Sequence, residues 1–251
     1  MTHLGKINDI EKIKTIPELM ERAGWLRNKK LSQVFEEIAG EDNVSRVHSK
    51  GSVGTALEKG FFNIPQNSRA EADIPHLGVE IKTCPLKYNG DRTRLSIKEP
   101  LSLNIINYFD EDKCEKFTDS ALYKKNAKIL FIFYIHDFEK ERSEYLIKYV
   151  FLWNMNEEVL SELSPDYEKI KEMIRGGKAH EIHQHQHKYL TICPKHGGTF
   201  RDPNCTVSKR NQPHSEVLAE LRAFRLKNKY MNLIVSRHLG KPLKQGGWEE
   251  K

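Results

Sequence analysis

An aspartate and a Glu-x-Lys pair are the residues of this chain whose types and spacing point most directly to chemistry. Asp73 precedes the triplet Glu80-Ile81-Lys82, and residues two apart on a strand project from the same face. Carboxylate oxygens bind Mg²⁺, which helps to generate hydroxide, and a nearby ammonium can orient the attacking water or stabilise charge on a phosphate. The spacing therefore predicts metal-assisted phosphodiester hydrolysis, with Asp73 and Glu80 as metal ligands.

The same pattern also arises by chance in charged proteins. In that alternative, Glu80 and Lys82 belong to an ordinary solvated strand face. The surrounding sequence favours the catalytic interpretation, because Val79 and Ile81 give the strand an apolar opposite face and Gly78 permits a turn that brings Asp73 to the entrance of the strand.

The elements that must position these residues follow from hydrophobic periodicity. Apolar residues at helical spacing predict two helices over 16–38, and the glycines of KGSVG introduce a short helix over 53–60. Further along the chain we expect a helix over 165–174, a strand over 188–192 and an alternation of helix, strand and helix over 215–239. Four central strands are predicted over 77–84, 101–108, 129–135 and 145–153.

One domain is the simplest organisation for 251 residues, because the chain contains no internal repeat and no low-complexity linker. We predict a single domain over 1–240 with three successive parts. These are an N-terminal helical layer (1–48), a catalytic core (49–155) and a DNA-recognition part (156–240). Residues 241–251 are polar and contain glycine, so we expect a flexible tail.

Charge and composition indicate what kind of partner the protein binds and in which cell compartment it acts. The net charge is +6 with a pI near 9.0, and charges of both signs make up 30% of the chain, a balance that suits a polyanionic partner. No apolar run is long enough to cross a bilayer, and the N-terminus lacks the apolar region of a secretory signal. We therefore expect a cytoplasmic protein whose four cysteines are reduced thiols.

The segments KGSVGTALE and DIPHLGVEIKT resemble the MutH-like endonuclease family. This resemblance implies a restriction-endonuclease-like α/β fold of the PD-(D/E)xK type, with a mixed sheet flanked by helices, and Mg²⁺ as cofactor. It adds Glu58 to the metal ligands Asp73 and Glu80, makes Lys82 catalytic, and suggests Lys125 as a further catalytic lysine. The DNA contact expected in the first segment is Lys50.

Four later segments are similar to the catalytic half of the GATC-cutting Sau-type restriction enzymes: RLSIKEPLSLNIINY, GKAHE, RNQPHSE and RAFRLKNKYM. The resemblance runs from about residue 50 to residue 239, although enzymes of that type are about twice as long. It implies cleavage of double-stranded DNA at a short site, with GATC as the expected target. A palindromic target further implies a homodimer on DNA or two successive binding events.

The predicted DNA contacts gather near the C-terminus. By resemblance, Lys195 of Cys193-Pro194-Lys195 and Lys227 of Phe224-Arg225-Leu226-Lys227 contact DNA, and Cys193 and Arg225 depart from the pattern of the repair enzymes. We also assign Arg225 to the DNA contacts. The residue types of one polar loop suit base edges, although an ordinary solvated loop explains them equally well. Its candidate contacts are Arg201, Arg210, Asn211 and Gln212.

A histidine-rich stretch raises the alternative of a zinc site. Its candidate ligands are His180, His183, His185, His187, Cys193, His196 and Cys205. Their spacing matches no zinc module and includes no CxxC pair, and the alternating histidines are typical of an exposed strand. His76 could approach the scissile phosphate, but a structural role is the simpler interpretation.

The function expected from these observations is that of a Mg²⁺-dependent type II restriction endonuclease. Two alternatives stay open. The first is a partner-activated nicking endonuclease of mismatch repair, and the second is a DNA-binding module of the same fold without catalysis. The full set of Glu58, Asp73, Glu80 and Lys82 argues against the binding module, because clustered carboxylates repel a polyanion.

Overall fold

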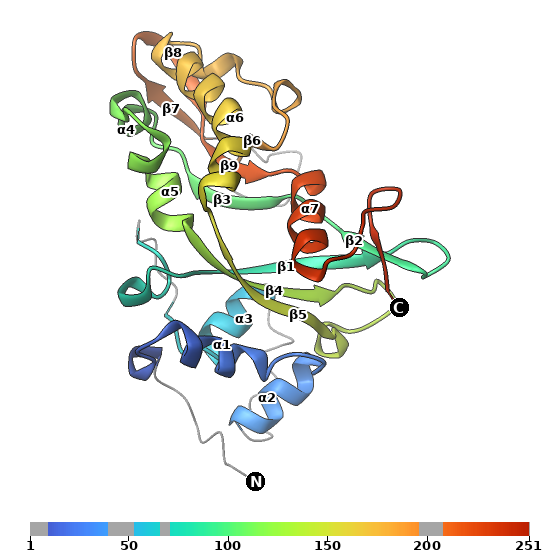
Figure 1. Ribbon diagram of the computed structural model, residues 1–251. Helices are drawn as coiled ribbons and strands as arrows, with labels where there is room; N and C mark the ends of the chain where they lie inside the picture. The colour runs from blue at the N-terminus through green and yellow to red at the C-terminus, as the bar shows by residue number, and fades with distance from the viewer. Residues whose placement is uncertain (1–9, 40–52, 66–70, 196–207, 251) are drawn as a thin grey trace. The chain divides into compact units, whose positions relative to one another are not determined.

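The computed structural model describes residues 10–39, 53–65, 71–195 and 208–250 (Figure 1). The chain forms two compact units, each assembled from separated stretches. Unit 1 contains Met1–Lys98, Lys128–Asn154 and Gly247–Lys251, and unit 2 contains Glu99–Ala127 and Met155–Gly246. These boundaries differ from the predicted succession of 1–48, 49–155 and 156–240, because strands distant in sequence complete each unit.

Unit 1 is built on a mixed five-stranded sheet in the order β10-β2-β1-β4-β5. Its strands are β1 (Glu80–Tyr88), β2 (Arg94–Ile97), β4 (Lys128–Ile135), β5 (Ile147–Asn154) and β10 (Trp248–Glu249). β1 and β4 are parallel, and every other neighbouring pair is antiparallel. The strands predicted over 77–84, 129–135 and 145–153 are therefore neighbours in one sheet, and the predicted mixed α/β fold is confirmed. The strand at 145–153 is an edge strand rather than a central one.

Helices cover this sheet through a shared apolar core. They are η1 (Ile10–Lys12), α1 (Ile16–Gly24), α2 (Leu31–Ala39), α3 (Val53–Gly60), η3 (Pro75–Leu77) and η5 (Arg142–Glu144). Thr15 and Glu18 form a capping box that fixes the start of α1. Buried Leu19 and Leu57 from the helices belong to the same core cluster as Ile81 and Leu130 from the sheet. Burial of these side chains stabilises the layer that carries β1.

Unit 2 contains a three-stranded antiparallel sheet and a separate hairpin. The sheet has the order β3-β9-β6, with β3 (Leu101–Ile105), β6 (Leu190–Pro194) and β9 (Arg222–Leu226), and the hairpin pairs β7 (Lys209–Gln212) with β8 (Ser215–Glu220). Its helices are α4 (Tyr108–Lys113), η4 (Phe117–Asp119), α5 (Ala121–Asn126), α6 (Glu157–Arg175), η6 (Ala179–Glu181), η7 (Gln184–Gln186) and α7 (Asn228–Leu239). No helix in the described ranges has the length and apolarity needed to cross a membrane.

Several predictions about elements were wrong. Segment 101–108 is not a fourth strand of the central sheet, because β3 pairs with β9 in unit 2. The first element of 215–239 is the strand β8 rather than a helix. Finally, the described part of 241–251 is not a loose tail. Trp248 pairs with Leu95 of β2 and is fully buried, and its indole Nε1 donates to the Tyr149 hydroxyl at 3.3 Å.

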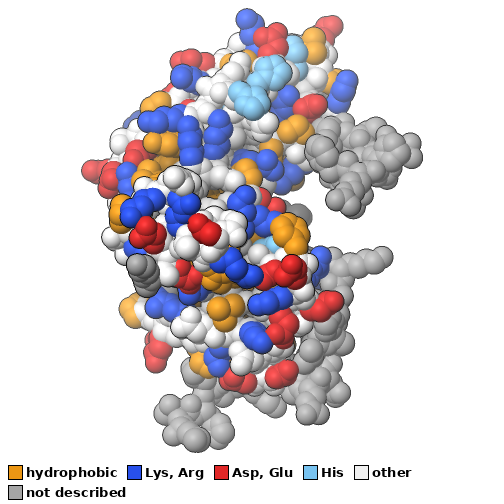
Figure 2. Space-filling view, turned by 90° about the vertical axis from the view of Figure 1, so that its right-hand side faces the viewer, with side chains coloured by type: hydrophobic (Ala, Val, Ile, Leu, Met, Phe, Trp, Pro, Cys, Tyr) orange, Lys and Arg blue, Asp and Glu red, His pale blue; other side chains and the backbone are white. Residues whose placement is uncertain are grey.

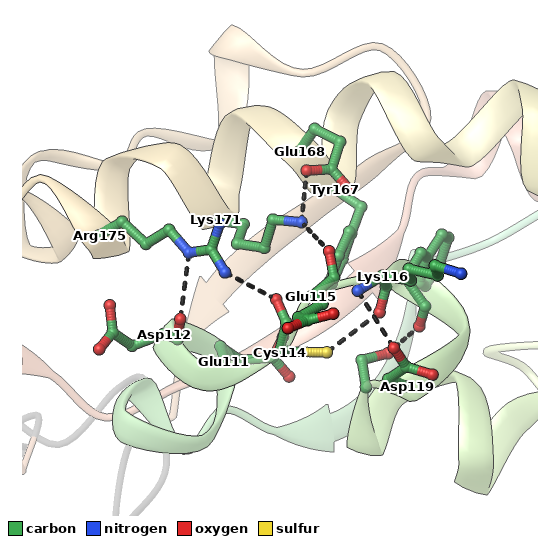
Figure 3. A network of polar contacts seen from close by, with 12 residues as sticks. Glu111, Asp112, Cys114, Glu115, Lys116, Asp119, Tyr167, Glu168, Lys171 and Arg175 are labelled. Atoms are coloured by element: carbon green, nitrogen blue, oxygen red, sulfur yellow. Dashed lines mark hydrogen bonds and ion pairs between the residues drawn. The ribbon is translucent and has the colours of Figure 1, made fainter.

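A buried polar network ties α4 to α6 within unit 2 (Figure 3). The hydroxyl of Tyr167 donates to Glu111 Oε2 at 2.6 Å, and Lys171 Nζ donates to the carbonyl of Glu115 at 3.0 Å. The guanidinium of Arg175 donates to the Asp112 and Cys114 carbonyls, so α6 satisfies carbonyls that α4 leaves unpaired at its end. Burial raises the pKa of the Glu111 carboxyl above its usual range.

Candidate active site

A tight turn brings Asp73 back onto the start of β1. Ile74 and Val79 form an antiparallel bridge, with N–H···O distances of 2.9 and 3.2 Å in the two directions. The intervening η3 helix ends at Gly78, whose φ of 64° lies in the left-handed region that glycine adopts without strain. The residue types of this short segment therefore position the aspartate locally, as the sequence predicted.

Backbone and side-chain hydrogen bonds link the two carboxylates. The backbone N–H of Asp73 donates to Glu80 Oε2 at 3.2 Å, and the N–H of Ile81 donates to Asp73 Oδ2 at 2.9 Å. Lys82 Nζ lies 2.5 Å from Glu80 Oε1, which shows that both side chains project from one face of β1. The structure therefore assembles Asp73, Glu80 and Lys82 into one site in unit 1.

The burial of Glu80 gives this site its electrostatic character. Its side chain is 2% exposed, whereas that of Lys82 is 21% exposed. An ionised carboxylate taken out of water requires a cation or strong hydrogen-bond donors to compensate its lost hydration. Lys82 supplies that cation here, and the lysine itself stays accessible from solvent.

The donor set fits a hard divalent cation. Mg²⁺ is commonly bound through one or two carboxylates, with waters and substrate phosphates completing its octahedral shell. Asp73 and Glu80 supply two adjacent carboxylates, and the pairing of Glu80 with an ammonium shows that the site stabilises positive charge. Within the described residues, no group of three or more His, Cys, Asp or Glu side chains is arranged to hold a metal.

Glu58 and Lys125 are the two further catalytic residues that the family resemblance suggested. Glu58 is half-buried on α3, a helix that contacts β1, but it does not complete a three-ligand group with Asp73 and Glu80. Lys125 lies on α5 in unit 2 and is partly buried, whereas its neighbours Lys124 and Lys128 are exposed. The roles of Glu58 and Lys125 stay predictions.

His76 proves to be tied to the N-terminal region. Its Nε2 lies 2.7 Å from the carbonyl oxygen of Ile13, so Nε2 must carry the proton that forms this hydrogen bond. The contact joins the tip of the η3 turn to a buried residue beside α1. Sequence analysis missed Ile13 because nothing in its residue type or local spacing signals a partner so distant in sequence.

The predicted base-reading loop contains an anchoring residue. Lys50 and Arg201 lie outside the described residues, whereas Arg210 and Asn211 are exposed on β7. Gln212 is only 3% exposed, and its amide accepts from the N–H of Ala179 and donates to His180 Nδ1 and the Val217 carbonyl. Every amide atom of Gln212 is therefore already paired in this conformation, and its role as a DNA contact stays a prediction.

The other predicted DNA contacts lie on or beside β6 and β9. Lys195 is partly exposed at the end of β6. Arg225 pairs with Thr191 across β9 and β6, and its buried Nε has no hydrogen-bond partner among the residues that the structure describes. Lys227 donates to the carbonyl of His187, and burial, together with nearby Lys229, lowers the pKa of its ammonium. Their roles on DNA stay predictions.

The histidine-rich stretch is not the exposed strand that the alternation predicted. His183 precedes the short helix η7 and His185 lies within it, whereas His187 is buried, with Nδ1 3.4 Å from the Thr191 hydroxyl. Burial lowers the pKa of His187 and favours its neutral form. The described histidines and cysteines form no metal-holding group, and His196 and Cys205 lie outside the described residues.

Charge on the surface is mixed. Figure 2 shows Lys and Arg side chains interspersed with Asp and Glu over the viewed face, as the composition predicted. The viewed face is therefore not uniformly basic.

A mixed α/β sheet with an aspartate and a Glu-x-Lys at the start of a central strand defines the restriction-endonuclease-like class. A model of the family described as "DNA mismatch repair enzyme MutH" matches residues 62–166, which include Asp73, Glu80 and Lys82. The type II restriction enzyme Sau3AI of Staphylococcus aureus is 34% identical over 207 residues, covering 81% of this chain and 40% of that enzyme. The chain therefore resembles the MutH-like DNA endonucleases and is related to Sau3AI.

The relatives differ in how much of their length this chain matches. The DNA mismatch repair protein MutH of Shewanella woodyi is 27% identical over 90% of this chain and 94% of its own length. MutH of Actinobacillus pleuropneumoniae is 27% identical over 90% of this chain and 95% of its own length. The chain thus spans nearly all of these repair proteins but less than half of the restriction enzyme.

Proposed function

We propose that this protein is a Mg²⁺-dependent endonuclease that cuts double-stranded DNA at a short specific site, as a type II restriction enzyme does. The observation that carries the proposal is the assembly of Asp73 and Glu80 beside Lys82 at the start of β1. A module that only binds DNA gains nothing from a buried carboxylate near a polyanion, and such a carboxylate would weaken binding by repulsion.

In this mechanism Asp73 and Glu80 would hold the metal, and Lys82 acts on the reacting phosphate. Mg²⁺ would supply Lewis-acid polarisation and would favour the formation of hydroxide from water. Lys82 Nζ orients the attacking water and stabilises charge as the new phosphorus–oxygen bond forms and the bond to O3′ breaks. The leaving oxygen takes up a proton, so the products are a 5′-phosphate and a 3′-hydroxyl.

The proposed target is GATC, by resemblance to the Sau-type enzymes. One site of this kind cuts one strand, so cleavage of both strands of a palindrome needs two subunits on DNA or two successive binding events. A homodimer on the DNA follows the two-fold symmetry of the target. The protein would act in the cytoplasm, where its DNA substrate lies.

The second candidate function is that of a strand-nicking endonuclease activated by a partner protein. It is favoured by one specific observation: the similarity to MutH of Shewanella woodyi extends over 94% of that protein. The departures at Cys193 and Arg225 from the repair-enzyme pattern favour the restriction enzyme. Cutting without any partner protein would exclude the nickase.

Plasmid cleavage tests the proposal. Unmethylated plasmid with GATC sites is incubated with the protein in Mg²⁺ or in EDTA, and the fragment ends are sequenced. We expect Mg²⁺-dependent fragments ending at GATC, and none with Glu80→Gln. Nicked circles that appear only with a partner protein would favour the second function. Intact plasmid that the protein nevertheless binds would identify a non-catalytic module.

A further inference from the structure

Two lysines lie over one tyrosine ring on the surface of unit 2. The ammonium of Lys188 lies 4.6 Å from the centre of the Tyr189 ring, and that of Lys229 lies 5.4 Å from the same centre. Both lysines are exposed, and among the described residues neither forms an ion pair. The negative face of an aromatic ring holds cations at such distances without neutralising their charge.

Tyr189, whose ring both lysines contact, is held in place by its neighbours. Its ring lies 4.8 Å from that of buried Tyr230, and its carbonyl accepts from the backbone N–H of Lys227 at 2.9 Å. Asp166, 3% exposed, accepts from the backbone N–H groups of Lys188, Tyr189 and Leu190 at 2.7, 2.5 and 2.9 Å. The segment is therefore preorganised, which lowers the entropic cost of binding.

The lysines at the start of α7 place positive charge where the helix dipole disfavours it. Lys227 precedes α7 and Lys229 lies in its first turn, although the N-terminus of a helix favours negative charge. That first turn contains no acidic residue, and Lys227 caps no backbone N–H. Local conflicts of this kind concentrate at functional sites, where a ligand compensates them.

Nearby acidic groups do not relieve the conflict. Both oxygens of Asp166 accept from backbone N–H groups. Glu162 accepts from the Tyr230 hydroxyl and is paired with Arg237, which lowers its pKa, and the charge of Lys188 contributes less to this shift. The ammonium groups of Lys188 and Lys229 are therefore available to bind an external anion.

We infer that Lys188, Tyr189 and Lys229 form a binding site for phosphates of the DNA backbone, outside the catalytic residues and outside the contacts suggested by family resemblance. The inference rests on the proposed function for its polyanion. Two ammonium groups on one ring offer point charges to phosphates without reading base edges, so the site adds affinity but no sequence preference.

The test is the salt dependence of DNA binding, measured by fluorescence anisotropy in EDTA so that cleavage does not interfere. Each neutralised phosphate contributes about −0.9 to the slope of log Kobs against log[salt]. We expect the double variant Lys188→Ala/Lys229→Ala to reduce the slope by about 1.8 between about 50 and 200 mM salt. The loss should be the same on specific and non-specific duplexes.

Matched variants separate charge from folding. Lys188→Arg/Lys229→Arg keeps both charges and should keep the slope. Lys30→Ala removes a lysine that Glu144 already pairs in unit 1, and should change nothing. Tyr189→Phe should bind like the wild type, whereas Tyr189→Leu should bind severalfold more weakly.

Each outcome decides one question. A slope unchanged by the double alanine variant would overturn the inference while leaving the proposed function intact. Unchanged affinity of Tyr189→Leu would remove the ring from the site and overturn the assignment of three residues. Failure of the wild-type chain to bind duplex DNA would refute the proposed function itself. This outcome is distinct from those of the variants, because it is measured on the wild-type protein alone.

Discussion

The ammonium of Lys82 lies 2.5 Å from Oε1 of Glu80, a carboxylate that is 2% exposed. The residue proposed to act on the phosphate therefore also neutralises a proposed metal ligand. A metal that binds Glu80 competes with this ammonium for the same oxygen and is repelled by its charge. The relationship makes metal affinity and catalysis respond in opposite directions when Lys82 is changed.

Lys82→Met should strongly slow cleavage while strengthening metal binding. We expect a loss of about 100-fold or more in rate, because a group that stabilises transition-state charge is removed. Affinity for Ca²⁺, measured by isothermal titration calorimetry, should rise at least about fivefold, since like charges 4 Å apart repel by about 1 kcal/mol even in water. Lys124→Met provides an exposed control. Weaker Ca²⁺ binding by Lys82→Met would contradict the competition.

His76→Ala should lower kcat more than it changes KM for DNA. The hydrogen bond from Nε2 to the Ile13 carbonyl fixes the turn between Asp73 and Glu80, and small displacements of reacting groups cost up to about 100-fold in rate. His76→Gln offers an amide N–H to the same carbonyl and should recover most of the activity. Steady-state kinetics test both variants, with exposed His185→Ala as control. Equal activity of the alanine and glutamine variants would argue against a positioning role.

Glu111→Gln should alter how stability depends on pH. The raised pKa of Glu111 means that the folded state binds the proton more tightly than the unfolded state does. Its stabilising contribution is therefore present below the usual carboxyl pKa and is lost as pH rises through the raised value. Glutamine keeps an acceptor for Tyr167 and has no such titration, so the variant should gain stability relative to wild type as pH rises.

Urea denaturation across this pH range measures the effect. Exposed Glu115→Gln is the matched control and should follow the wild-type pH dependence. A constant difference between Glu111→Gln and wild type at every pH would show that the carboxyl does not titrate in this range.

Trp248→Ala should destabilise unit 1. The indole is fully buried beside β2, and removal of a buried aromatic side chain costs roughly 3 to 5 kcal/mol. Leu243→Ala, at a position 38% exposed, should change the free energy of unfolding by less than about 0.5 kcal/mol. If thermal unfolding of the two variants were alike, the C-terminal strand would contribute nothing to the sheet.

The sequence by itself determined many of the elements and the clustering of Asp73, Glu80 and Lys82. Asp73, Glu80 and Lys82 lie within a few residues of one another, so strand periodicity and one left-handed glycine suffice to bring them together. The capping box of α1 and the apolar runs of β4 and β5 are likewise local signals. Such features follow from the geometry of residues that are close in sequence.

Only the tertiary structure decided which segments pair and which polar groups are buried. The apolar sequence of Leu101–Ile105 is typical of a central strand, but in the structure this strand pairs with β9 of unit 2. The residues around Trp248 are polar, so the local sequence does not indicate that its side chain is buried. Gln212 lies in a polar segment typical of a loop, but its amide is bonded to Ala179, His180 and Val217 in the folded protein. His76 finds Ile13 in the same way. These contacts join residues far apart in sequence. The local sequence pattern cannot predict them, because the partners come together only when the whole chain folds.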